Sequence, residues 1–238
     1  METFWLDIVQ WLHSIGLHPD ADFAAGVANA AGKMDMPSLL ALAAALGWAS
    51  GFRLYAVVFL VGMMGMSGYV VLPQGLQVLQ HPAVLTVSGF MLFMEFFADK
   101  IPGFDSLWDL MHSVIRVPAG AALAAAVFFG ADNGTMTLLA ALLGGTLAAT
   151  SQAAKTTTRA AINASPEPFT NIGASLVEDG VSVGAVWLAA THPLVFGVLL
   201  VVVVIAMWFV TWWLVKFLRT AFRRLSRFLS SRPAGAEA

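Results

Sequence analysis

The chain has 238 residues, of which 59% are hydrophobic and only 11% are charged, and its formal net charge is −2. An ordinary soluble domain has about 25% charged residues, so this composition excludes that class and predicts a polytopic membrane protein. The sequence contains no cysteine, which excludes a disulfide framework, a thiolate metal site and a thiol catalyst.

The N-terminal residues 1–36 are predicted to lie in the membrane interface. Apolar residues recur there at the spacing of an amphipathic helix, at Phe4, Trp5, Ile8, Trp11, Leu12 and Ile15. The segment carries acids and lacks a basic beginning, so it does not have the pattern of a cleavable signal peptide. We expect a single transmembrane domain over residues 37–215 to follow it.

Six segments of that domain are candidate membrane spans, since a spanning helix needs roughly 20 apolar residues. They run over residues 38–66, 82–101, 117–130, 135–163, 169–190 and 193–215. The third is short, and the preceding stretch 104–116 either extends it or forms an interfacial or re-entrant helix. We therefore predict an all-α membrane protein with about six transmembrane helices, flanked by N-terminal and C-terminal amphipathic helices.

The last segment, residues 216–238, begins as a strongly basic tail. Phenylalanines interleave with its bases, which are Lys216, Arg219, Arg223, Arg224 and Arg227. This pattern predicts binding to anionic lipid headgroups rather than to nucleic acid. Because Lys and Arg in short loops mark the cytoplasmic side, we expect the C-terminus to be cytoplasmic and, with six spans, the N-terminus as well. The outer loops would be residues 67–81, 131–134 and 191–192, which contain no Lys or Arg.

The two halves of the domain carry related segments. Residues 39–53 read LLALAAALGWASGFR and residues 141–155 read ALLGGTLAATSQAAK, so each is a small-residue helix that ends on a base. The halves would be residues 37–130 and 135–215, with three spans in each. An odd number of spans inverts the second half relative to the first, which is a common construction of secondary transporters. Small-residue faces also let helices approach closely. Such faces can pair between two copies of the chain, so a homo-oligomer is possible.

Charged residues within the apolar segments are the main functional signal, because a charge inside a bilayer is costly and marks a site by default. The primary candidates for binding a substrate or ion are Arg53, Glu95, Asp99, Lys155, Glu178 and Asp179. Further polar residues on the same helix faces or beside them are secondary candidates, namely Lys100, Asp105, Arg116, Ser151, Arg159, Asn171 and Ser175.

These charges allow more than one interpretation. They can pair with one another and only fix helix packing, although buried ion pairs often stabilise a protein no more than hydrophobic residues do. Alternatively, they line a hydrated pathway or a binding site. A divalent-cation site at Glu95, Asp99 and Asp105 is a weaker alternative, because the spacing is not that of a calcium-binding loop.

Several of these motifs resemble those of a known family. The stretches EFFADKIPGFD, IRVPAGA, SQAAKTTTRAAIN and TNIGASLVEDG are similar to motifs of a bacterial membrane family catalogued as domain of unknown function 4126. The resemblance covers residues 38–208. Val117 and Ile172 depart from the family pattern, where an arginine directly precedes the proline and a proline follows the asparagine. The resemblance supports the choice of candidate residues and implies a bacterial inner membrane protein, but the family has no assigned activity.

The leading functional hypothesis is a small secondary transporter or channel of the bacterial inner membrane, with an intramembrane charged site that couples to protons or cations. The alternative is a non-catalytic membrane scaffold or lipid-handling protein whose charges are structural. An intramembrane lipid enzyme is a third hypothesis, but the sequence has no zinc-hydrolase or Ser–His motif to support it. We therefore expect a protein that is not an enzyme and has no cofactor.

Overall fold

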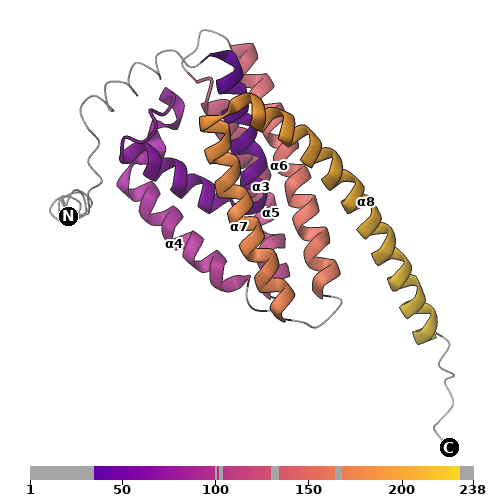
Figure 1. Ribbon diagram of the computed structural model, residues 1–238. Helices are drawn as coiled ribbons and strands as arrows, with labels where there is room; N and C mark the ends of the chain where they lie inside the picture. The colour runs from indigo at the N-terminus through magenta and orange to yellow at the C-terminus, as the bar shows by residue number, and fades with distance from the viewer. Residues whose placement is uncertain (1–34, 100, 102–103, 130–133, 164–167, 231–238) are drawn as a thin grey trace, which may run out of the picture.

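The computed structural model describes residues 35–99, 101, 104–129, 134–163 and 168–230, and in this part of the chain every regular element is helical (Figure 1). The elements are α3 (Met36–Met66), the 3₁₀ helix η1 (Gln74–Gln80), α4 (Pro82–Ala98), α5 (Phe104–Ala126), α6 (Gly134–Asn163), α7 (Pro168–Thr191) and α8 (Pro193–Ser230). The predicted interfacial segment lies outside the described residues except for its last two positions, and so do Lys100 and the end of the basic tail.

Each of the six apolar segments predicted from the sequence forms a helix. The stretch 104–116 does not form a separate interfacial helix, because it continues into the third segment as the single helix α5. The predicted outer loop at residues 67–81 contains η1, which the sequence analysis missed. Among the described residues, four helices are long and apolar enough to cross a membrane, and η1 with α4, bent by 69°, makes a fifth candidate if the bent pair is one span. The chain is thus an all-helical, membrane-type protein over the described residues.

Helix starts follow from local capping chemistry. Asp35 precedes α3 and its side chain accepts a hydrogen bond from the backbone N–H of Ser38 at 3.2 Å, while Pro37 lies in the first turn, where its missing N–H is not needed. The α4 start repeats this arrangement, with His81 as the cap and Pro82 as the first helical residue.

Helix α3 is broken at its centre. Arg53 has φ −142° and ψ 70°, which is not helical, so the helix consists of a first half (residues 36–52) and a second half (residues 54–66). The second half packs along η1, because a side chain on Gly62 would meet Leu79, and η1 reaches the end of α5, because a side chain on Gly75 would meet the carbonyl of Ala126. The second half therefore leaves the course of the first half at the break and runs toward η1 and α4 at one side of the bundle (Figure 1).

The direction of α3 does not confirm the predicted six alternating spans or the inverted repeats. Both would make the first half of α3 antiparallel to α6. The two segments instead run side by side in the same direction, with Gly47 beside Gly144 and Phe52 beside Lys155. The break at Arg53 accompanies this arrangement, since it turns the second half of α3 away from the course that the first half follows along α6.

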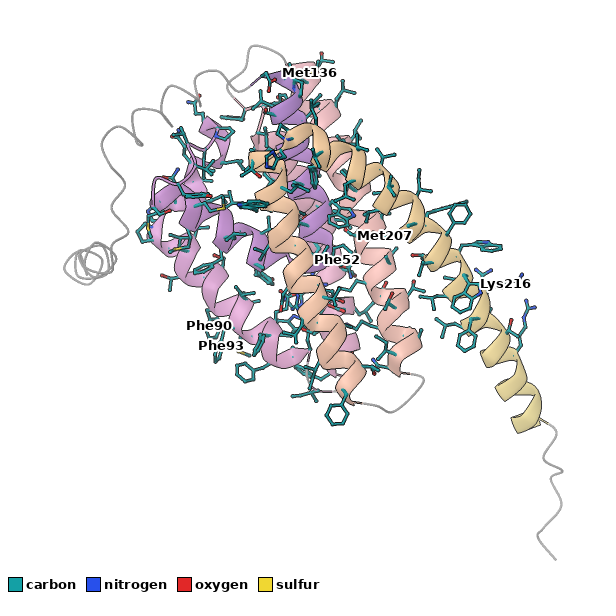
Figure 2. The ribbon with its side chains drawn as sticks, in the orientation of Figure 1. Phe52, Phe90, Phe93, Met136, Met207 and Lys216 are labelled. Carbon is teal, nitrogen blue, oxygen red and sulfur yellow. The ribbon has the colours of Figure 1, made fainter. Side chains whose placement is uncertain are left out.

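As a consequence, the two ends of the transmembrane domain lie at opposite ends of the bundle. Helices α3 and α6 both begin at one end of the bundle, where Met136 lies, and α8 ends at the other (Figures 1 and 2). This arrangement does not support the expectation that the chain enters and leaves the domain on the same side.

Small residues bring α3, α5 and α6 into close contact. A methyl group on Gly47 would collide with the Cα of Gly144, and one on Gly144 would collide with the Cβ of Ala124. The apolar core around this contact has two parts. One lies between α3, η1, α5, α6 and α7, and the other lies between α3, α6, α7 and α8, including Trp48 and Phe196. Close approach of the backbones is what small-residue helix faces achieve in membrane proteins.

Helix α8 packs on the bundle only through its first part. Its 38 residues extend for about 57 Å at a rise of 1.5 Å per residue, and its C-terminal part projects away from the other helices (Figure 1). Met207 faces the bundle near Phe52, whereas Lys216 lies on the projecting part (Figure 2). Elsewhere the outer faces are apolar, as at Phe90 and Phe93 of α4, which are 61% and 59% exposed. Such faces are suited to contact with lipid.

Substituting Gly47 tests the contact between α3 and α6. Gly47→Ala should destabilise the protein by about 1–3 kcal/mol, because the added methyl group overpacks a contact between two backbones. Gly184→Ala on α7 is the matched control, since nothing lies within 4 Å of its Cβ position. Thermal unfolding in detergent, followed by circular dichroism, measures both. Equal unfolding temperatures for the two variants would contradict the close approach of α3 and α6 at this glycine.

Candidate functional site

Ten charged side chains from five elements meet around the break in α3, and we call them the ion network. The bases are Arg53, Arg116, Lys155 and Arg159, and the acids are Glu95, Asp99, Asp105, Asp109, Glu178 and Asp179. Nine of the ten residues are buried. Asp179 is the exception, with 31% of its side chain exposed. The network lies inside the helix bundle and reaches its surface at Asp179.

Arg53 lies at the break in α3 and contacts four acids of the network. Its Nη1 lies 2.5 Å from Asp99 Oδ2 and its Nε lies 2.8 Å from Asp179 Oδ1. Its Nη2 donates to Ser175 Oγ at 2.5 Å, and Ser175 Oγ donates in turn to Asp99 Oδ2 at 3.2 Å. One guanidinium group thereby joins α3 to the end of α4 and to α7.

Helix α6 supplies the groups that stabilise the broken end of the first half of α3. Lys155 Nζ donates to the carbonyl of Phe52 at 3.1 Å, and Ser151 Oγ donates to the carbonyl of Trp48 at 2.7 Å. A helix end leaves carbonyl groups without intrahelical partners and carries partial negative charge, so a lysine there is favourable. Lys155 also lies 3.0 Å from Asp109 Oδ1 and 3.4 Å from Glu178 Oε2.

Arg116 and Arg159 complete the basic part of the network. Arg116 pairs with Glu95 and with Asp109 Oδ1 at 2.8 Å. Arg159 lies 3.1 Å from Glu178 Oε2 and 3.8 Å from Asp105 Oδ2. Each base contacts at least two acids, so the charges are shared rather than arranged as separate pairs. Such sharing compensates for part of the cost of removing the ions from water.

Three buried carboxylates use only one oxygen in these contacts. Among the described residues, Glu95 Oε2, Asp99 Oδ1 and Asp109 Oδ2 have no hydrogen-bond partner although they are fully buried. An unsatisfied buried acceptor costs about 1–3 kcal/mol, and more when it is charged. These oxygens are therefore hydrogen-bond acceptors that the network leaves unused.

The structure brings together all six primary candidates from the sequence. Of the secondary candidates, Asp105, Arg116 and Arg159 join the network as ions, while Ser151 and Ser175 hydrogen-bond to its neighbours or members. Lys100 and the side chain of Asn171 lie outside the described residues. The acids are interleaved with bases, and within the described part of the chain no three His, Asp or Glu residues are grouped as metal ligands, which does not favour the divalent-cation alternative.

Sequence reasoning missed Asp109, which contacts both Arg116 and Lys155, and Gln152, whose Oε1 accepts from Arg116 Nη1 at 3.1 Å. A signal for Asp109 was present. Asp105, Asp109 and Arg116 are spaced by four and seven residues and therefore share one helix face. That face was overlooked because the apolar residues of the same stretch predicted an interfacial helix.

The fold and the site together define an integral-membrane type of helical protein with a buried, acid-rich ion network. The sequence profile of the domain of unknown function DUF4126 matches residues 40–213, and the chain belongs to this family. The match includes every member of the ion network. No curated protein and no solved structure matches the chain.

Neutralising a base in the network should destabilise the protein. Arg116→Gln leaves Glu95 and Asp109 without their nearest cation, and breaking a buried pair in this way costs about 3–5 kcal/mol. Adding Asp109→Asn should restore part of that loss, because it removes one of the unpaired charges.

Thermal unfolding in detergent measures both effects, with Arg219→Gln on the exposed part of α8 as the matched control. If Arg116→Gln unfolds at the same temperature as Arg219→Gln, the network does not contribute to stability as described.

Proposed function

We propose that this protein is a small secondary transporter or channel of the bacterial inner membrane, and that the ion network couples its activity to protons or cations. The observation that carries the proposal is the broken helix α3. Its break falls at Arg53, and Arg53 contacts carboxylates from α4 and α7. The break in helix α3 thus lies within the ion network of a membrane-type bundle.

Discontinuous helices have a physical role in transporters. Where a helix is unwound, backbone groups and half-helix ends become available to ions or polar substrates. Irregular backbone is tolerated at such depth only where protein or a polar cavity satisfies it. Here Lys155 and Ser151 satisfy carbonyls next to the break, which keeps the break polar without exposing it to lipid.

The charges themselves also support a functional role. Within the described part of the chain the network holds six acids and four bases, whereas a purely structural network would be expected to balance its ions. Retaining an excess of buried carboxylates is costly for packing alone. It is useful where a cation or a proton must be bound and released.

The second candidate is a non-catalytic membrane scaffold or lipid-handling protein. The completeness of the pairing favours it, since every base of the network contacts at least two acids. In this case the charges specify which helices pack together. We propose no catalytic role for the network, because its groups are engaged with one another.

Proton movement in liposomes separates the two candidates. The purified protein is reconstituted with an enclosed pH-sensitive dye, and a potassium diffusion potential is applied with and without a panel of small cations and polar solutes. We expect proton movement above the level of protein-free liposomes. We expect Glu178→Gln to abolish it, because Glu178 contacts Arg53, Lys155 and Arg159.

The matched control is Asp35→Asn, which makes the same kind of change at an exposed helix cap and keeps a residue that caps well. Size-exclusion chromatography shows whether each variant remains folded. Absence of flux for protons and for every solute of the panel would reject transport and leave the scaffold as the better account.

The end of α8 supports a proposal about membrane orientation. A bilayer has a hydrocarbon core about 30 Å thick, so about 20 residues of α8 suffice to cross it. The exposed Trp208, Trp212 and Trp213 then lie at the interface, and Lys216, whose Nζ lies 5.3 Å from the centre of the Trp212 ring, lies in the headgroup layer. We propose that this end is cytoplasmic and binds anionic headgroups, which places Asp35 toward the opposite side.

Lipid retention tests this second proposal. Each basic residue near an anionic surface contributes about 1 kcal/mol, so replacing Lys216, Arg219 and Arg223 together by glutamine should lower the preference for phosphatidylglycerol over phosphatidylcholine by at least about tenfold. Native mass spectrometry of protein purified from an equimolar mixture of the two lipids measures the preference. An unchanged lipid ratio in the triple variant would show that the end of α8 does not select anionic lipid.

A further inference from the structure

We infer that the ion network holds an exchangeable proton, that Asp179 is the carboxylate through which this proton enters, and that protonation of Asp179 releases Arg53 at the break of α3. The inference rests on the proposed transport function in that it names the coupling ion as the proton. Proton binding itself can be measured without any transport.

Among the residues that the structure describes, the acids of the ion network outnumber its bases. Asp105 can be left aside because Asn163 Nδ2 donates to it at 3.0 Å and it is 3.8 Å from its nearest described base. Five acids then face four bases, which are Arg53, Arg116, Lys155 and Arg159. An uncompensated carboxylate in a buried site takes up a proton rather than remaining ionised.

The geometry favours a proton over a metal ion. The free oxygens Glu95 Oε2, Asp99 Oδ1 and Asp109 Oδ2 belong to three different carboxylates, and the bases contact the other oxygen of each. The acids are therefore separated by cations, and a metal ion would be repelled by them. A proton needs only one oxygen, so its binding does not require several acids to converge on one point.

Asp179 differs from the other acids in two respects that identify it as the entry point. It contacts a single base, Arg53, whereas Glu178 contacts three. It is also the member whose side chain is substantially exposed, at 31%. A carboxylate with few cations around it loses the least ionic stabilisation when it is neutralised. An exposed carboxylate can also exchange protons with water.

Besides Arg53 of α3, charged groups from four other helices belong to the network around Asp179. Helix α4 contributes Glu95 and Asp99, α5 contributes Asp109 and Arg116, α6 contributes Lys155 and Arg159, and α7 contributes Glu178 next to Asp179. The acids in this surrounding favour protonation of Asp179 and the bases oppose it. Because acids are in excess, the balance favours uptake of a proton.

Protonation changes the contacts of Arg53. When a proton from water binds the Asp179 carboxylate, the ionic attraction between Arg53 Nε and Oδ1 at 2.8 Å is lost. The guanidinium then has alternative acceptors in Glu178 Oε2 at 3.8 Å and Glu95 Oε1 at 3.9 Å. Arg53 is the residue with non-helical backbone, so a shift of its side chain acts directly on the joint between the two halves of α3.

Infrared spectroscopy of the full-length protein in lipid measures this proton. The C=O stretching band of a protonated carboxyl group is followed from alkaline to acidic pH, with carboxyl-¹³C aspartate to distinguish Asp from Glu. The wild type should show a titrating aspartate band that is missing in Asp179→Asn. In Asp179→Glu the band should move from the aspartate to the glutamate position.

Asp35→Asn is the control, because Asp35 is exposed and the hydrogen bond from Ser38 lowers its pKa below the ordinary value. Its own band therefore appears only at lower pH, and the variant should keep the band assigned to Asp179. If Asp179→Asn fails to fold, the wild type and Asp179→Glu still decide the question.

The results overturn the inference if the wild type has no such band, or if the band is the same with and without the Asp179 carboxyl group. Loss of the inference and loss of the transport proposal are distinguishable. A titrating band without flux rejects transport alone, and flux without the band rejects Asp179 as the proton entry point alone.

Discussion

The contact on which the rest of the structure depends is the one between Arg53 and the acids around it. A guanidinium group buried among helices is stable only when carboxylates surround it. Asp99 from the end of α4 and Asp179 from α7 both lie within 3 Å of it. To reach them, the chain gives up helical geometry at Arg53, and Lys155 compensates by donating to the freed carbonyl of Phe52. The break, the ion network and the course of α3 are thus one feature.

Small residues make this arrangement possible. The first half of α3 lies so close to α6 that a side chain at Gly47 or Gly51 would collide with Gly144 or Ser151. The close approach brings the base that ends each related segment, Arg53 in one and Lys155 in the other, to two shared acids, Glu95 and Glu178. Larger residues at these glycines would separate the helices and leave the carboxylates without one of their bases.

The sequence was sufficient to predict which segments form the helix bundle and which residues form most of the ion network. Apolar length located the six long helices, and charges within apolar segments identified Arg53, Lys155 and their acids. The sequence was not sufficient to predict the break in α3. The stretch GFRL at residues 51–54 contains no proline, and only the tertiary pairing of Arg53 makes the break favourable. Nor could it show that α3 and α6 are parallel, since hydrophobic pattern reports a buried face and not a direction. Asp109 was missed because α5 carries its charged face and its apolar face in the same stretch.

The most direct test of the central claim is the distance between the Arg53 guanidinium and a carboxylate in a lipid bilayer. Solid-state NMR on protein labelled with ¹⁵N in arginine and ¹³C in the aspartate carboxyl group measures it through nitrogen–carbon dipolar coupling, and the Asp99→Asn variant assigns it. We expect a strong coupling that disappears in the variant. A guanidinium coupled instead to lipid phosphorus or to mobile water would mean that the charges face outward and that the buried network does not exist.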